Sequence, residues 1–226
     1  MNIIITTRKQ HPIEDEKLYR LFQQSFQQWY DSGIDAPFLH HTFEEFQSFV
    51  KRAVVFLAID ADNEELLGMH CFSCYKKKRS AAGFYLAISP KAKHQGIATK
   101  LLECEKEQFL ARGYRYLKGT TSVPAVWSVR WHLKNGYRIV GFGIGCKPYG
   151  DTYSFRLQLA PSLLWDGPLA PMTAKCSYFV SRTAAYLTHR SSDGSLNWIG
   201  RMARRIMRKK LRVPNLHRYV YSELIK

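Results

Sequence analysis

One short run in the first half of the chain combines the residue types that bind phosphate groups. An apolar stretch through Ile88 predicts a buried strand, and Pro90 ends it because proline cannot donate to a β-ladder. A basic turn with Lys93 and His94 follows, and the small residues of 96–98, Gly-Ile-Ala, lead into an apolar pattern with helical spacing. The start of a helix carries unpaired backbone N–H groups and a partial positive charge. The run therefore predicts a strand–turn–helix unit that binds phosphate oxygens.

The same run resembles the acyl-CoA signature of the GCN5-related N-acetyltransferases, the GNAT superfamily. An aliphatic-x-Pro at the strand end is followed by Lys93-x-x-Gly96-x-Ala98, in which Lys93 replaces the family's usual Arg or Gln. Residues 131–137, Trp-His-Leu-Lys-Asn-Gly-Tyr, resemble the family's helix-ending Leu-Tyr-x-Lys-x-Gly-Phe. The resemblance implies an α/β fold with a mixed sheet, and direct transfer of an acetyl group from acetyl-CoA to a primary amine.

The resemblance also implies which residues bind acetyl-CoA. The main chain of Leu86 and Ile88 would bond the pantetheine arm, on a strand that splays from its neighbour. The turn and the helix start would hold the phosphates with Lys93, His94, Gln95, Gly96, Ile97, Ala98 and Thr99. A phosphate-binding turn without acyl-CoA is the alternative.

The catalytic residues are less clearly marked. By resemblance, His132 stands where the family often has a Tyr that protonates the departing CoA thiolate, and a histidine that titrates near neutrality can supply that proton. A lone histidine on a helix is more often a packed or surface residue, and Tyr85 and Ser89 on the central strand are the alternative catalytic residues. Two departures from the family favour weak catalysis. Ala125 replaces an Asn that contacts CoA, and residues 81–89 contain no carboxylate that could act as the base.

Acidic residues near the first two helices are candidates for binding a cationic acceptor, because the resemblance makes this region a wall of the acceptor pocket. We name Asp31 and Asp35, with Glu44 and Glu45 beside them. Ordinary surface acids and helix caps are the alternative, since Thr42 and Glu45 have the spacing of a capping box.

The periodicity of apolar residues predicts the elements that position these groups. We expect strands at 2–7, 54–60, 66–75, 81–89, 114–120, 139–144 and 153–159, and helices at 14–30, after 42, at 99–112 and at 124–135. These elements form one GNAT-like domain over residues 1–160.

Residues 161–226 form a linker and a helical, basic extension that the resemblance does not cover. A helix over 171–189 would place Cys176, Phe179, Val180, Thr183 and Leu187 on one face, and a second helix over 196–211 would be basic and amphipathic. Residues 201–226 hold half of the chain's net charge of +16. Three interpretations remain: the second helix packs on the domain or on a second subunit of a homodimer, lies on an anionic membrane surface, or grips nucleic acid through residues 195–226.

Composition sets the remaining limits. The chain of 226 residues has no apolar run long enough to span a bilayer and begins without a signal peptide, which predicts a cytoplasmic protein. Its five cysteines suggest free thiols in a reducing compartment, and the Cys71-x-x-Cys74 pair lacks the partners of a metal site, so no metal is expected. The function predicted is N-acetyl transfer. The alternative is a catalytically weak GNAT-fold binding module that docks through its basic helix.

Overall fold

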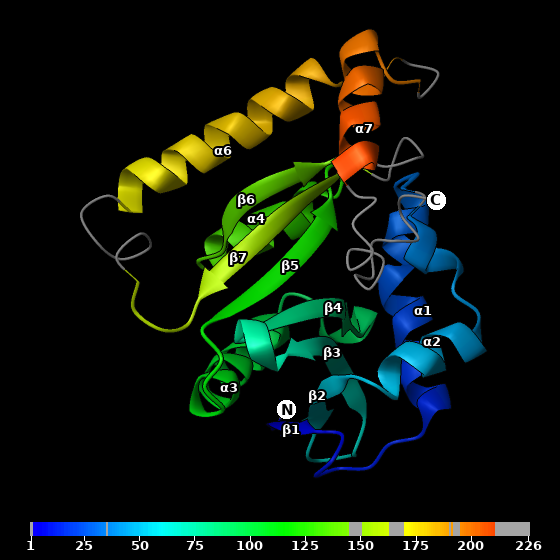
Figure 1. Cartoon of the computed structure of the whole chain (residues 1–226). Coiled ribbons are helices and arrows are strands. Elements are labelled where there is room, and N and C mark those ends of the chain that lie inside the picture. The colour runs from blue at the N-terminus through cyan, green and yellow to red at the C-terminus, as the bar shows by residue number, and fades with distance from the viewer. Residues whose placement is uncertain are drawn as a thin grey trace. The chain divides into compact units, whose positions relative to one another are not determined.

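A computed structural model describes residues 2–34, 36–144, 151–162, 170–189, 191 and 195–210 (Figure 1). The strands of this part of the chain are β1 (Ile3–Thr7), β2 (Val54–Asp60), β3 (Leu66–Tyr75), β4 (Ser80–Ile88), β5 (Tyr116–Ser122), β6 (Arg138–Gly143) and β7 (Thr152–Gln158). They form one mixed sheet of seven strands in the order β1-β2-β3-β4-β5-β7-β6. The α-helices are α1 (Asp15–Asp31), α2 (Phe43–Val50), α3 (Ile97–Ala111), α4 (Val126–Lys134), α6 (Ala170–Leu187) and α7 (Trp198–Lys210), with short 3-10 turns η1 (Pro37–His40), η2 (Lys76–Lys78) and η3 (Pro90–Ala92).

The predicted order of strands and helices is confirmed, with small shifts at the element ends. The helix of the phosphate turn begins at Ile97, two residues before the predicted start. The next helix begins at Val126, so Pro124 precedes its N-cap, Ala125, and is not in its first turn.

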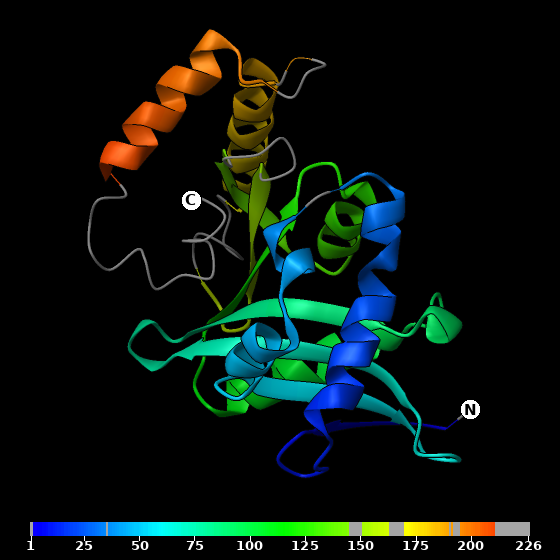
Figure 2. The same ribbon diagram turned by 90° about the vertical axis from the view of Figure 1, so that its right-hand side faces the viewer.

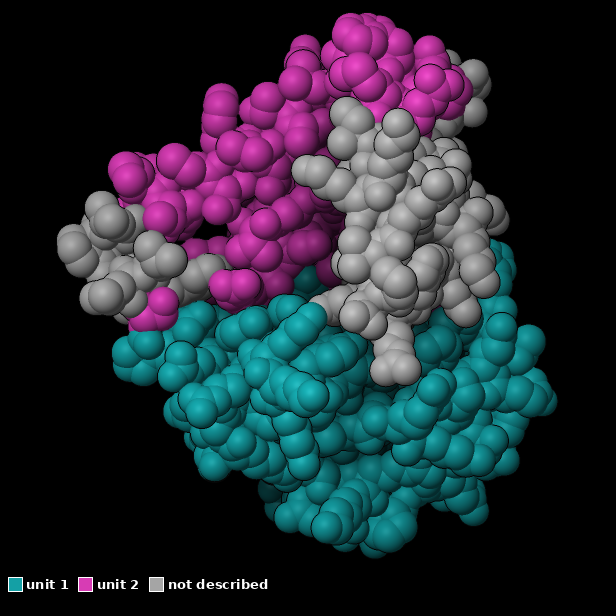
Figure 3. Space-filling view, viewed as in Figure 1, with its two compact units in different colours: residues 1–33, 39–119, 157–161 teal, residues 34–38, 120–156, 162–226 magenta. Residues whose placement is uncertain are grey.

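The chain divides into two compact units, which Figure 3 colours separately. Unit 1 comprises Met1–Gly33, Leu39–Gly119 and Leu157–Pro161, and unit 2 comprises Ile34–Phe38, Thr120–Arg156 and Ser162–Lys226. The domain boundary expected near residue 160 stays a prediction.

Unit 1 is built on the antiparallel strands β1 to β4, with α1 and α2 on one face and α3 on the other (Figure 2). On the α1 face, the ring of Tyr85 in β4 packs against Phe22 and Phe46 at centroid distances of 4.9 and 5.6 Å. On the α3 face, Phe109 packs against Phe56 and Phe72 at 5.6 and 4.8 Å. Both layers bury large aromatic side chains, which is the main source of stability expected for such a unit.

The start of α1 is fixed by polar contacts with its neighbours. Asp15 forms an ion pair at 2.6 Å with Arg8, the residue that follows β1. It also accepts a hydrogen bond at 2.8 Å from the side chain of Gln47 in α2. These contacts tie α1 and α2 to the edge of the sheet.

Unit 2 contains the antiparallel β6–β7 hairpin, in which Ile139 pairs with Phe155, and the helices α4, α6 and α7. α6 packs along β6. The residues predicted to share one face of this helix do share it, but that face is exposed: Phe179, Val180 and Leu187 are 69%, 64% and 44% accessible to solvent. The buried residues on this side of the chain are instead Ser181 of α6 and Thr188, which directly follows the helix.

Candidate functional site

The open edge of β4 is the first feature of the candidate site. The parallel pairing of β4 with β5 extends from Ser80, opposite Tyr116, to Ala82, opposite Lys118. The later residues of β4, up to Ile88, have no β5 residue in register. Their outward backbone groups therefore make no ladder hydrogen bonds with β5, and we call this unpaired stretch the open edge of β4.

A β-bulge reshapes β4 at the same place. Met69 of β3 pairs with Ala87, whereas Cys71 pairs with Phe84, so that two residues of β4, Tyr85 and Leu86, lie opposite one residue of β3. Tyr85 has φ of 52°, a left-handed conformation that is uncommon for a residue with a large side chain. Such a bulge turns a side chain and its backbone away from the regular pleat, which is common beside functional sites.

The turn between β4 and α3 has the geometry of an anion site. Gly96 is the N-cap of α3 with φ of 75°, and no side chain caps the helix. His94 also has a left-handed backbone, with φ of 64°. An added Cβ on Gly96 would meet no atom within 4 Å, so the space beside the helix start is open. The glycine is required by its positive φ, and the N–H groups at the very start of a helix have no intrahelical acceptor.

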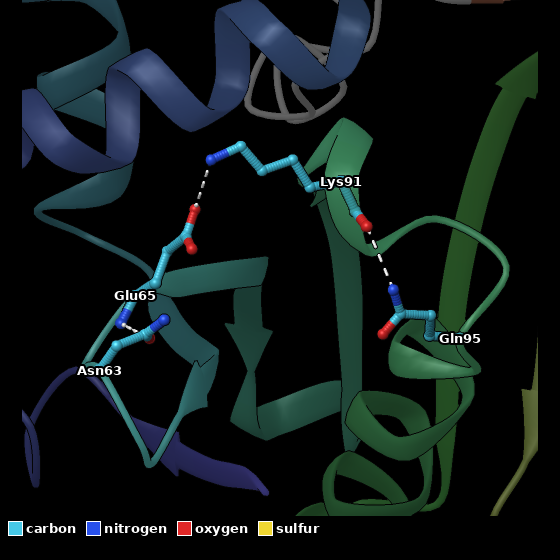
Figure 4. A network of polar contacts seen from close by, with 4 residues as sticks. All are labelled: Asn63, Glu65, Lys91 and Gln95. Atoms are coloured by element: carbon cyan, nitrogen blue, oxygen red, sulfur yellow. Dashed lines mark hydrogen bonds and ion pairs between the residues drawn. The ribbon is translucent and has the colours of Figure 1, made fainter. Parts of the chain in front are cut away.

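The cations and amides around the turn make specific contacts, two of which Figure 4 shows. Lys91 extends to the β2–β3 hairpin and donates to Glu65 Oε1 at 3.4 Å, and Gln95 donates to the Lys91 carbonyl at 3.1 Å. Lys93 Nζ donates to Gln28 Oε1 of α1 at 2.5 Å. Of the two basic residues predicted to bind phosphate, Lys93 is half-buried and His94 is exposed.

Ser25 of α1 is a candidate site residue that the sequence analysis missed. The Ile88 N–H, which the resemblance assigns to the pantetheine arm, donates to Ser25 Oγ at 2.9 Å. The next amide, of Ser89, donates to the Leu67 carbonyl of β3 at 2.8 Å, and the Ser89 side chain is buried. No local pattern connects Ser25 with a strand more than 60 residues away, so no sequence signal could have identified it.

Tyr85 and His41 form a hydrogen-bonded couple on the α1 face of β4. The Tyr85 ring is 6% exposed, and its hydroxyl bonds to Nδ1 of His41, which precedes the N-cap of α2. The imidazole of His41 stacks on the ring of Phe49 at a centroid distance of 5.1 Å. The backbone carbonyl of His41 accepts a hydrogen bond from the Tyr19 hydroxyl at 2.9 Å. Phenol and imidazole can together move a proton, which is the chemistry that acyl transfer to an amine requires.

His132 lies in α4, in unit 2. Its Nδ1 donates to the Ser128 carbonyl at 2.8 Å, and its ring stacks on Phe155 at 4.4 Å and meets Tyr137 edge-on at 5.0 Å. Because Nδ1 holds a proton for this hydrogen bond, Nε2 can donate a proton only from the imidazolium form. The contacts also fit a packed histidine, the alternative considered from the sequence.

The acidic candidates have local partners. Asp31, at the end of α1, is exposed and accepts a hydrogen bond from Gln27 at 3.1 Å. The predicted capping box is confirmed, since the Thr42 N–H donates to Glu45 Oε2 at 2.9 Å and the Glu45 N–H donates to Thr42 Oγ1 at 3.3 Å. The pKa of Glu44 lies below its usual value because a backbone N–H donates to its carboxylate. Asp35 lies outside the described residues.

A buried histidine–glutamate contact below the bulge is a second feature that the sequence analysis missed. His70 Nδ1 of β3 lies 2.9 Å from Glu105 Oε1 of α3, and both side chains are almost fully buried. Gly83 of β4 provides the room, since a Cβ there would lie 2.6 Å from His70 Nε2. The pair fixes α3, and with it the turn, against the sheet.

The described cysteines are free thiols. Cys71 is buried and burial raises the pKa of its thiol, while Cys74, three residues later in β3, is exposed. Within the described ranges, no group of three or more His, Cys, Asp or Glu side chains is arranged to hold a metal ion.

Comparisons with known proteins concern the family and the fold of the chain. The model of the Acetyltransferase (GNAT) family matches residues 16–137, which is more than half of the chain. No curated protein matches the sequence. The ribosomal-protein-S18-alanine N-acetyltransferase of Escherichia coli is a similar solved structure, with a TM-score of 0.56 at 15% identity over 71% of this chain and 96% of that one.

Two further similar structures contain coenzyme. The PaiA N-acetyltransferase of Thermoplasma acidophilum, in complex with coenzyme A, has a TM-score of 0.57 at 15% identity over 70% of this chain and 99% of that one. A GNAT family acetyltransferase from Elizabethkingia anophelis with acetyl-CoA bound has a TM-score of 0.54 at 16% identity over 70% and 98%. At these identities the similarity concerns the fold.

Proposed function

The chain belongs to the GNAT acetyltransferase family, and from that premise we propose that it transfers the acetyl group of acetyl-CoA directly to a primary amine. One observation carries the proposal: the open edge of β4 runs into a turn that exposes the start of α3. Acetyl-CoA matches both parts, since its pantetheine arm has amide groups for a strand edge and its diphosphate suits a helix start.

We assign the diphosphate to the N–H groups at the start of α3. Gly96, Ile97 and Ala98 supply the amides, and the left-handed backbone of His94 and Gly96 shapes the turn around them. The side chains of Gln95 and Thr99 border the same turn, and Lys93 can add its charge by leaving Gln28. A helix start favours an anion by about 0.3–1 kcal/mol, and several N–H groups add charge-assisted hydrogen bonds to this.

We assign the pantetheine arm to the main chain of Leu86 and Ile88. The Ile88 N–H is bonded to Ser25 Oγ, so the arm must either displace the hydroxyl or accept a hydrogen bond from it. In both cases Ser25 lies beside the acyl donor and helps to position it. By the family resemblance, a backbone N–H near Ile88 that the arm does not use would hold the oxygen of the tetrahedral intermediate.

We propose Tyr85 and His41 for proton removal from the acceptor. The Tyr85 hydroxyl takes the amine proton while its own proton passes to His41 Nδ1, so that the amine attacks the thioester carbonyl as a neutral nucleophile. The C–N bond forms, the attacking nitrogen releases its second proton to water, the C–S bond breaks, and the thiolate leaves. These proton transfers require no carboxylate on β4.

The departing thiolate needs a proton, and His132 is the proposed donor, from the imidazolium form that its Nδ1 bond requires. Ser89 remains the second candidate, although its side chain is buried. The reaction needs no metal ion.

The acceptor is proposed to be a cation when it approaches, with Asp31 and Asp35 attracting its ammonium group. Asp31 is exposed at the end of α1 and holds only the neutral side chain of Gln27 in its described hydrogen bond, so its charge is available.

The test of the proposed function combines binding and turnover. Calorimetry with CoA should give a clear binding heat, and acetyl-CoA with a panel of primary amines should release free thiol. In the turnover assay, Tyr85→Phe should lower kcat by about 100-fold or more, the range for loss of general base catalysis. Tyr19→Phe, which removes another tyrosine hydroxyl bonded to the same segment, is the matched control and should stay within a few-fold.

A pair of glycines at the two ends of α3 separates binding from folding. Gly96 and Gly113 have φ of 75° and 79°, and neither would meet another atom with an added Cβ. Alanine at either position should cost about 1 kcal/mol of stability. Only Gly96→Ala should weaken CoA binding, because it disturbs the phosphate turn. Equal CoA affinities for the two variants would remove the turn from the site.

The alternative function, a binding module, corresponds to tight CoA binding without thiol release for any amine.

A cytoplasmic location is proposed because the described cysteines are free.

A further inference from the structure

α6 presents a continuous apolar face to solvent. Met172, Phe179 and Tyr186 are spaced by seven residues, which places them in one line along the helix, and they are 57%, 69% and 77% exposed. Val180 and Leu187 flank this line and are also exposed. We call these five residues the apolar stripe.

The orientation of α6 is fixed by its other face. Ser181 and Thr188 are 4% and 5% exposed, and this side of the helix packs along β6 in the same unit. The Thr188 hydroxyl has a local hydrogen-bond partner, since it donates to the Ala184 carbonyl at 2.7 Å. A surface helix of a globular protein normally turns its apolar side inward. Here small polar residues face the sheet and large apolar residues face water. An exposed apolar patch of this kind marks a surface that binds a partner.

α7 adds a second exposed face with a related composition. Trp198 and Met202 are 64% and 49% exposed, whereas Gly200 on the opposite side is buried. Arg201 and Arg205 are exposed, and the helical spacing places them beside Trp198 and Met202. An exposed Trp with neighbouring arginines is typical of a helix that lies at the boundary between water and lipid.

The charge of this region decides what the partner is. Lys175 and Arg182 are exposed next to the stripe, and residues 170–210 contain nine Lys or Arg and one acidic residue, Asp193. A second copy of the chain would bring the same positive charge to the interface and be repelled. Nucleic acid would satisfy the charges, but it would leave the apolar side chains without a complementary surface.

We infer that the exposed faces of α6 and α7 bind the surface of an anionic lipid bilayer. Phe179, Tyr186 and Trp198 insert among the acyl chains near the headgroups. Lys175 and Arg182 of α6 bind lipid phosphates, together with Arg201 and Arg205 of α7. Within the described residues, no helix is both long and apolar enough to cross a bilayer, so the contact is peripheral. The inference does not depend on the acetyl-transfer proposal.

Vesicle flotation of the full-length protein tests the inference. Vesicles of phosphatidylcholine with phosphatidylglycerol should carry the protein to the top of the gradient, and vesicles of phosphatidylcholine alone should not. The double variant Phe179→Ser/Tyr186→Ser should lower the partition coefficient by about tenfold or more, since two large apolar side chains no longer insert. The charge variant Arg182→Glu/Arg205→Glu should give a similar loss, and added salt should reduce binding of the native protein.

The controls keep the result specific to the stripe. Leu110→Ser alters another exposed apolar residue on a helix, 48% accessible at the end of α3, and should bind vesicles like the native protein. Thermal unfolding should show that every variant is folded.

Three outcomes would overturn the inference. The first is absence of vesicle binding, and the second is equal binding by the stripe variants. The third is a dimer in vesicle-free sedimentation that Phe179→Ser/Tyr186→Ser dissociates, which would assign the stripe to a second copy of the chain.

Discussion

α3 and α6 are both amphipathic helices that pack along strands, but they turn opposite faces outward. α3 buries Leu101, Leu102 and Phe109 completely and exposes acidic and basic residues. α6 buries Ser181 and exposes Phe179. The difference teaches that periodicity identifies which residues share a face, whereas only the packing of the chain determines whether that face meets the core, water or another partner.

The largest expected effect is on the free energy of unfolding, when a phenylalanine on each helix is replaced by alanine and the two losses are compared. Phe109→Ala should lower the free energy of unfolding by about 3–5 kcal/mol, because it leaves a cavity between α3 and the sheet. Phe179→Ala, on the exposed face of α6, should change it by less than about 0.5 kcal/mol. Urea unfolding measures both. A comparable loss for the two variants would mean that the α6 face is buried in solution, and the comparison would fail.

A slightly smaller effect should sharpen the comparison within α3. Glu105→Ala leaves His70 without its buried partner and should cost about 3 kcal/mol, as removal of one member of a buried pair does. Glu103→Ala removes an exposed carboxylate from the same helix and should cost little. If both variants unfold at the same urea concentration, the buried pair does not hold α3 in place.

The smallest effect concerns thiol chemistry and leaves the fold unchanged. Cys176 is exposed on α6, whereas Cys71 is buried in β3 and its pKa is raised by that burial. The thiolate is the reactive form, so at pH 8 a maleimide should label Cys176 rapidly and leave Cys71 unlabelled until the protein unfolds. Mass spectrometry of labelled peptides measures this, with Cys176→Ser as the control. Rapid labelling of Cys71 under native conditions would contradict the burial described for β3.

The parts that could be predicted from the sequence are those fixed by neighbouring residues. The strand end at Pro90, the glycine of the turn and the capping box at Thr42 each depend on contacts within a few positions, and the structure contains all three. Local chemistry of this kind leaves a readable pattern, since caps and left-handed turns accept few residue types.

The parts that were missed depend on contacts between distant segments. Ser25 meets Ile88, His41 meets Tyr85, and His70 meets Glu105. Each of these residues is ordinary in its local sequence, and its partner is selected by the way helices and strands pack. For the same reason, helical spacing predicted which residues of α6 share a face, but it could not predict that this face is exposed.

The hydrogen bond between Ser25 and Ile88 has a thermodynamic consequence for the proposed donor. A coenzyme arm that displaces the Ser25 hydroxyl from this amide replaces one acceptor with another, so it gains little enthalpy there. Most of the affinity must then arise at the phosphates, and CoA should bind much more weakly as ionic strength rises. A truncated thioester that lacks the nucleotide would be a poor substrate even though it carries the reacting atoms.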